Sequence, residues 1–134
     1  LKQKKRKKKV ICLIGDQELM EGTTWESLHI IENYKIKNLI LIIDRNKSDF
    51  RSIRFLEIKK KLSVFSDKIH EINGHNLLEI KDALKKSLTN KSFNIIIANT
   101  VKGYGIKSIE NNPAWHHKSP TTEELKNFKK ELCL

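Results

Sequence analysis

Apolar and polar positions along the chain alternate between short, nearly continuous apolar runs and longer amphipathic stretches. Four runs predict strands, at Val10–Ile14, Asn38–Ile43, Lys68–Ile72 and Phe93–Thr100. Three of these runs are apolar at almost every position, which is typical of parallel strands that are covered on both faces. We therefore expect an α/β fold, with a mostly parallel sheet and helices on both of its faces.

Each of three predicted helices begins with a side chain that can cap its free backbone N–H groups. The predicted starts are Thr23 with Glu26, Asn76 with Glu79, and Thr121 with Glu124. Apolar residues recur behind each start at helical spacing and predict the buried stripes. They are Trp25, Leu28, Ile31 and Tyr34 in the first helix, Leu77, Ile80, Leu84 and Leu88 in the second, and Leu125, Phe128 and Leu132 in the third.

Polar side chains follow two of the predicted strands. Asp16 comes after Gly15 at the end of the first strand, and Asp44 and Asn46 follow Ile43 at the end of the second. In open parallel sheets, ligands bind beyond the carboxyl ends of the strands. If these two strands are neighbours, Asp16 and Asn46 would reach one crevice with oxygen ligands that suit magnesium. Gly15 would also let the backbone approach a phosphate.

Composition is that of a soluble globular domain. The chain has 134 residues, of which 38% are hydrophobic and 32% charged. No apolar run approaches the ~18 residues of a membrane-spanning helix, so we do not expect a membrane protein. Cys12 and Cys133 lack the spacing of a metal or redox pair, and this usage suits the cytoplasm. Within its apolar run, Cys12 is expected to be a small buried residue.

The net charge of +11 is concentrated at the start of the chain. The stretch "LKQKKRKKK" is basic at seven positions, so we divide the chain into a basic N-terminal segment, 1–9, and one domain, 10–134. We interpret the segment as solvated, with contact to a nucleic acid or an anionic surface as the alternative. No aromatic residue lies among these lysines to stack on bases, which argues against a nucleic-acid partner.

The segment "GDQELMEGTTWESLHIIENYKIKNLILIIDRN" resembles the thiamine diphosphate signature of transketolases, in which Gly-Asp is followed about thirty residues later by Asn. Further on, "INGHN", "NTVKGYG" and "ENNPAWHHKSP" are similar to other segments of that family. The resemblance covers nearly the whole chain from Val10 onward. It implies a partial thiamine diphosphate-binding fold, corresponding to roughly the second half of the N-terminal domain of a transketolase.

The resemblance also implies ligands for Mg²⁺ and for the cofactor. The side chains of Asp16 and Asn46 and the backbone carbonyl of Ser48 would bind the metal, which bridges the diphosphate. The backbone around Gly15 and Gln17 would face the same diphosphate. Gln17 departs from the family, which usually has glycine there, and the loop after Asn46 is shorter than in the family.

The histidine of "NNPAWHHKSP" is the implied catalytic residue. His116 would approach the cofactor phosphate and the donor sugar and assist proton transfer. His117 is adjacent, and a register in which it takes this place stays open.

By resemblance, the chain is part of a transketolase-like transferase that moves a two-carbon ketol unit between sugar phosphates, with thiamine diphosphate and Mg²⁺. The family's pyrimidine-binding domain and the upstream half of its diphosphate-binding domain are not present, so we expect no activity from the isolated chain. A pyrimidine-binding (C-terminal) subunit or domain and an oligomer are the expected partners. Two alternatives stay open: a degenerate noncatalytic module, and a subunit of a thiamine-dependent dehydrogenase or deoxyxylulose-phosphate synthase.

Overall fold

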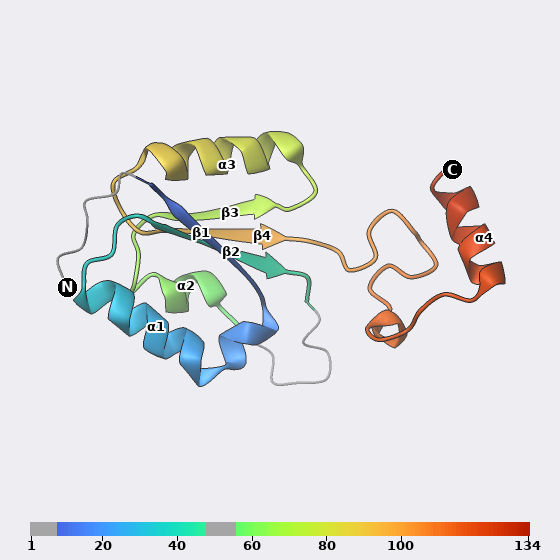
Figure 1. Cartoon of the computed structure of the whole chain (residues 1–134), viewed down its shortest axis with the longest axis horizontal. Helices are drawn as coiled ribbons and strands as arrows, with labels where there is room; N and C mark the ends of the chain where they lie inside the picture. Colours follow the sequence, from blue (N-terminus) through green and yellow to red (C-terminus); the bar gives the residue numbers. More distant parts are fainter. Residues whose placement is uncertain (1–7, 48–55) are drawn as a thin grey trace.

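The computed structural model describes residues 8–47 and 56–134, and its centre is a four-stranded sheet (Figure 1). The strands are β1 (Val10–Gly15), β2 (Leu39–Arg45), β3 (Ile69–Asn73) and β4 (Asn94–Asn99), in the order β1-β2-β4-β3. All three neighbouring pairs are parallel. The four predicted strands and the parallel α/β fold are therefore confirmed. Most of the basic N-terminal segment lies outside the described residues.

Helices cover both faces of the sheet (Figure 1). The short 3-10 helix η1 (Gln17–Met20), α1 (Gly22–Asn33) and α2 (Ile58–Leu62) lie on one face, and α3 (Leu77–Thr89) lies on the other. The larger core cluster is on the first face and contains Leu19, Leu28, Leu41, Ile43, Ile58, Leu62, Phe93, Ile95 and Ile97. A smaller cluster of Ile40, Ala83 and Ile96 lies beneath α3.

Two of the three predicted helix starts are confirmed. The side-chain oxygen of Asn76 accepts hydrogen bonds from the backbone N–H groups of Leu78 and Glu79, at 3.0 and 3.3 Å. Thr121 and Glu124 form a complete capping box at the start of α4 (Thr122–Glu131). In both places a short polar side chain satisfies donors that the helix itself leaves without a partner.

The predicted capping box of Thr23 and Glu26 is wrong. Helix α1 begins at Gly22, so Thr23 already lies inside its first turn. No side chain caps α1: the backbone N–H of Thr24 donates to the carbonyl of Glu21 at 3.2 Å, and the Thr24 hydroxyl donates to the carbonyl of Glu18 at 2.6 Å. Glu21 caps the end of η1 and directly precedes α1, so the two helical segments follow each other without a side-chain cap.

The α3 face of the sheet is covered incompletely. Helix α3 packs on β3 and β4 and leaves the edge strand β1 open, so Leu13 is 67% exposed. The predicted burial of Cys12 is wrong, because it lies on this same edge strand and is exposed. In the predicted stripe of α3, Leu77 and Leu88 are 80% and 50% exposed. Tyr34, predicted for the stripe of α1, is also exposed.

The chain after β4 leaves the carboxyl end of the sheet and forms a separate layer of loops that ends in α4 (Figure 1). It contains a second 3-10 turn, η3 (Pro113–Trp115). The Trp115 and Phe128 rings pack edge to face, with centroids 5.1 Å apart, and the Ser108 hydroxyl donates to Glu131 at 2.7 Å. These contacts join the loop to α4. In the described part of the chain, no helix is long and apolar enough to cross a membrane.

Candidate functional site

The carboxyl ends of β1, β2 and β4 are joined through Asp44. Its backbone carbonyl accepts the N–H of Asp16 at 3.0 Å. Its carboxylate accepts hydrogen bonds from the Thr100 hydroxyl and, at 3.3 Å, from the amide nitrogen of Asn46. The backbone N–H of Thr100 also donates to the carbonyl of Arg45 at 3.1 Å. The residues that follow three different strands therefore meet at one edge of the sheet.

Asp16 contacts the loop that carries Asn46. Its carboxylate is buried, with 6% of the residue exposed, and accepts the backbone N–H of Lys47 at 2.7 Å. Lys47 has a φ of 57°, so the chain turns sharply directly after Asn46. The structure thus brings two of the three predicted metal ligands to the same loop. Ser48, the third, lies outside the described residues.

The backbone at Gly15 already has an anionic neighbour. Its N–H donates to the Glu18 carboxylate at 2.6 Å, and a Cβ added at Gly15 would lie 2.7 Å from the same oxygen. Glycine at this position therefore makes room for Glu18. Gln17 begins η1 and is exposed. Contacts of Gly15 and Gln17 with a diphosphate stay a prediction.

A hollow of about 430 Å³ lies beside these strand ends. Its lining combines apolar residues with the polar residues Asp44 and Asn46, and it includes Lys102 from the loop after β4. Asp16 lies next to this hollow in the fold but does not line it. The lining residues are Leu13, Ile42, Asp44, Asn46, His75, Ala98, Thr100, Val101, Lys102 and Gly103.

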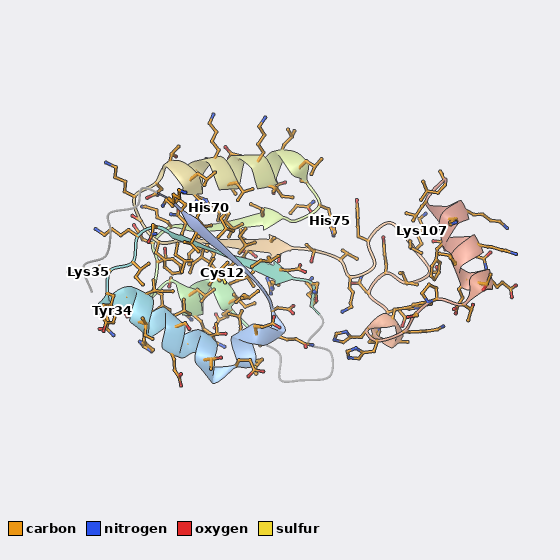
Figure 2. All side chains as sticks on the ribbon, viewed as in Figure 1. Cys12, Tyr34, Lys35, His70, His75 and Lys107 are labelled. Atoms are coloured by element: carbon orange, nitrogen blue, oxygen red, sulfur yellow. The ribbon has the colours of Figure 1, made fainter. Side chains whose placement is uncertain are left out.

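His75 holds the loop after β4 in place. Its Nε2 accepts the backbone N–H of Val101 at 2.8 Å, and its ring stacks on Tyr104 with centroids 3.7 Å apart. Figure 2 shows His75 at the end of the sheet from which the chain continues into the C-terminal layer. Gly103 has a φ of +77°, and a Cβ there would lie 2.9 Å from the carbonyl oxygen of Ile109. The loop that carries Lys102 is thus closely packed.

Lys102 connects the hollow to the predicted catalytic histidine. Its Nζ lies 3.3 Å from Nδ1 of His116, and the His116 ring stacks on His117 with centroids 4.2 Å apart. Both histidines are exposed. His116, and not His117, is thus the histidine that contacts a residue lining the hollow. Lys102 is not among the predicted site residues, although it lies in "NTVKGYG", one of the segments that carry the family resemblance.

The segment that follows the two histidines is attached to α4. The Lys118 ammonium lies 2.5 Å from the Glu124 carboxylate and 4.2 Å from the centroid of the Trp115 ring. The hydrogen bond from Lys118, followed by that from the backbone of Thr121, lowers the pKa of Glu124 from 4.5 to about 2. The charged form of Glu124 is therefore the one that the fold favours.

The donor set at the strand ends fits a hard divalent cation. Within residues 8–47 and 56–134, no group of three or more His, Cys, Asp or Glu side chains could hold a metal. Asp16 and Asn46 offer one carboxylate and one amide oxygen, which is a partial set. Magnesium suits such a site because it usually takes one or two protein ligands together with water and phosphate oxygens.

Comparisons with known proteins identify the family. Residues 3–134 match the family model described as "Transketolase, thiamine diphosphate binding domain". The chain is 37% identical over 131 residues to a subunit of the apulose-4-phosphate transketolase of Actinobacillus succinogenes, covering 94% of this chain and 48% of that protein. It is 34% identical over 115 residues to human transketolase, covering 82% of this chain and 18% of that protein.

A solved structure shows the same fold. The transketolase of Campylobacter jejuni superimposes with a TM-score of 0.83 at 26% identity, covering 95% of this chain and 21% of that one. The chain belongs to the transketolase family, in its thiamine diphosphate-binding domain. It spans about half the length of the relative from Actinobacillus succinogenes and about a fifth of the transketolases.

The ion pair of Glu124 predicts how the C-terminal layer responds to acid. Because the folded-state pKa of Glu124 is lowered from 4.5 to about 2, its stabilising contribution is fully present above 4.5 and is lost as the pH falls through about 2. An NMR titration of the Glu124 carboxyl carbon should show a midpoint near 2.

Two variants test whether Lys118 causes the lowered pKa of Glu124. Lys118→Ala should raise the midpoint toward 4.5, because it removes the largest cause of the shift. Lys126→Ala removes a lysine from the same helix and should leave the midpoint where it is. A midpoint above about 4 in the unchanged chain would contradict the ion pair.

Proposed function

We propose that this chain binds Mg²⁺ and the diphosphate of thiamine diphosphate at the carboxyl end of its sheet, as part of a transketolase-like transferase. The observation that carries the proposal is the convergence of Asp16, Asn46 and Lys102 on neighbouring strand ends and loops. An acidic ligand, an amide oxygen and a cation are the groups that a metal–diphosphate pair requires.

Asp16 and Asn46 are the proposed side-chain ligands of Mg²⁺, and the Ser48 carbonyl completes the proposed protein ligand set. Asp16 suits this role because its buried carboxylate is fixed by the backbone of Lys47, at 2.7 Å. A carboxylate that is held in place loses little freedom when it binds the metal. Burial also strengthens its attraction for a cation.

Lys102 is the proposed cationic contact of the diphosphate. Its Nζ lies close to His116 and it lines the hollow beside Asn46, so it can reach an anion held there. The backbone at Gly15 and Gln17 is proposed to face the same diphosphate. This approach requires the Glu18 carboxylate to leave the Gly15 N–H, since two anionic groups repel each other at such a distance.

His116 is the proposed catalytic residue. It is exposed at the edge of the C-terminal layer, beside Lys102, where it can exchange a proton with a hydroxyl group of a bound sugar phosphate. When bound, thiamine diphosphate supplies the carbanion chemistry of two-carbon ketol transfer. The chain's own residues hold the diphosphate and move a proton.

A partner is part of this proposal. A relative of this chain is named as one subunit of a transketolase, and the chain spans 48% of that relative. Leu13, Leu77 and Leu88 are exposed on the α3 face, and exposed apolar surface of this kind favours association. We propose that a pyrimidine-binding subunit or domain completes the site, that the chain is inactive alone, and that the complex is cytoplasmic.

A noncatalytic module is the second candidate. Two features favour it. The Glu18 carboxylate accepts the Gly15 N–H that would otherwise face the diphosphate, and Gln17 lies where the family usually has glycine. Such a module would keep the fold without binding the cofactor. Binding of thiamine diphosphate distinguishes the two candidates.

Asp16 provides the first test. Asp16→Asn should weaken Mg²⁺-dependent binding of thiamine diphosphate by at least about tenfold, because an anionic ligand is lost beside a diphosphate. The amide oxygen of asparagine can still accept the Lys47 N–H, so the fold should persist, whereas Asp16→Ala would also remove this acceptor. Calorimetry measures the affinity, and Glu26→Gln, at an exposed carboxylate of α1, serves as the control. Unchanged affinity in Asp16→Asn would count against the metal assignment.

His116 provides the second test. In a complex reconstituted with a pyrimidine-binding partner, His116→Ala should lower kcat by about 100-fold, with cofactor binding largely intact. His117→Ala is the matched control, because the two rings are stacked on each other and both are exposed. A loss of kcat in His117→Ala alone would show that the neighbouring histidine has the catalytic role.

A further inference from the structure

We propose that Asp44 is a positioning residue that fixes the orientation of the Asn46 amide, so that the amide oxygen and not the NH₂ group is presented to the divalent cation. The cation part of this inference rests on the proposed function. Asp44 itself is not a proposed ligand of the metal or the cofactor. Asp44 instead determines which end of the Asn46 side chain is available to the cation.

The chemistry of the two groups decides the orientation. The Asn46 amide nitrogen lies 3.3 Å from the Asp44 carboxylate. An ionised carboxylate only accepts hydrogen bonds, and only the NH₂ end of an amide can donate one. The contact therefore turns the Asn46 nitrogen toward Asp44 and its oxygen away from Asp44. A flipped amide would place two acceptor oxygens against each other.

The Asp44 carboxylate is itself held in place. Its other oxygen accepts the hydroxyl of Thr100, which follows the neighbouring strand β4. The backbone of Thr100 is in turn bound to the Arg45 carbonyl at 3.1 Å, and the strand register places Asp44 beside Ala98. Rotation of the carboxylate would break its bond to Thr100 or to Asn46. The Asp44 side chain is therefore held by hydrogen bonds to Thr100 and Asn46, and it restricts the rotation of the Asn46 amide.

Asp44 also sets the position of the other proposed ligand. Its backbone carbonyl accepts the N–H of Asp16 at 3.0 Å, and the Asp16 carboxylate accepts the N–H of Lys47 at 2.7 Å. Asp16 and Asn46 are thus both positioned relative to the same residue. Groups that orient metal ligands in this way typically change metal affinity by about 10- to 100-fold when they are replaced.

Asp44→Asn is the principal variant. Its oxygen can still accept the Thr100 hydroxyl, which leaves an NH₂ group facing Asn46. Asn46 must then turn its oxygen toward residue 44 and its own NH₂ group toward the cation. We expect the Asn46 side-chain NH₂ signals in the ¹⁵N–¹H spectrum of the metal-free chain to shift, and the affinity for Mn²⁺ to fall by at least about tenfold.

Two further variants separate orientation from charge. Thr100→Val removes the hydroxyl that clamps Asp44 without any change of charge, and it should shift the same Asn46 signals and weaken Mn²⁺ binding severalfold. Glu71→Gln removes a carboxylate near the same end of the sheet, where it contacts Arg45 at 3.4 Å. Glu71→Gln should leave the Asn46 signals in place. Its Mn²⁺ affinity should stay within about twofold of that of the unchanged chain, a smaller change than the loss expected when a positioning residue is replaced.

The outcomes are distinct. Asn46 NH₂ signals that are the same in Asp44→Asn, Thr100→Val and the unchanged chain would overturn the inference. So would equal losses of Mn²⁺ affinity in Asp44→Asn and Glu71→Gln, since charge alone would then account for both. If Asp44→Asn does not fold, Thr100→Val decides between the same results. Failure of the unchanged chain to bind Mn²⁺ would defeat the metal assignment of the proposed function, whereas the metal-free spectra would still decide the orientation of the amide.

Discussion

The parallel pairing of β2 with β1 on one side and β4 on the other is the constraint on which the candidate site depends. This register places Gly15 beside Asp44 and Arg45 beside Asn99, so three strands reach the same edge together. The residues that follow them can then bind one another and, as proposed, a metal and a diphosphate. A slip of one residue in β2 would turn Asp44 to the opposite face and separate it from Thr100.

Much of the fold could be predicted from local pattern, because three of the four strands are nearly continuous apolar runs and the starts at Asn76 and Thr121 use side-chain caps. The exposure of Cys12 could not be predicted, since it depends on β1 being an edge strand, and strand order is not a local property. The capping box at Thr23 failed because α1 begins one residue earlier, at Gly22, with only Glu21 between it and η1. In each case the position of another element, which the local pattern does not encode, decided the result.

The site also combines residues that local pattern identifies with residues whose roles depend on other elements. Asp16 and Asn46 could be named from the sequence because each closely follows an apolar run. The roles of Asp44, Thr100 and Lys102 arise from contacts across strands and loops, which hydrophobic pattern does not encode. On the α3 face, one helix covers the sheet only in part, and apolar residues are exposed there. We propose that a partner covers this surface and completes the site.

Calorimetric titration of the chain with thiamine diphosphate, with and without Mg²⁺ and with and without a pyrimidine-binding partner, tests the central claim most directly. The account predicts that binding requires Mg²⁺ and becomes tighter when the partner is present, because the proposed site would hold the diphosphate through a metal bound by Asp16 and Asn46. Absence of binding in every combination, or equal affinity after removal of Mg²⁺ with a chelator, would contradict it.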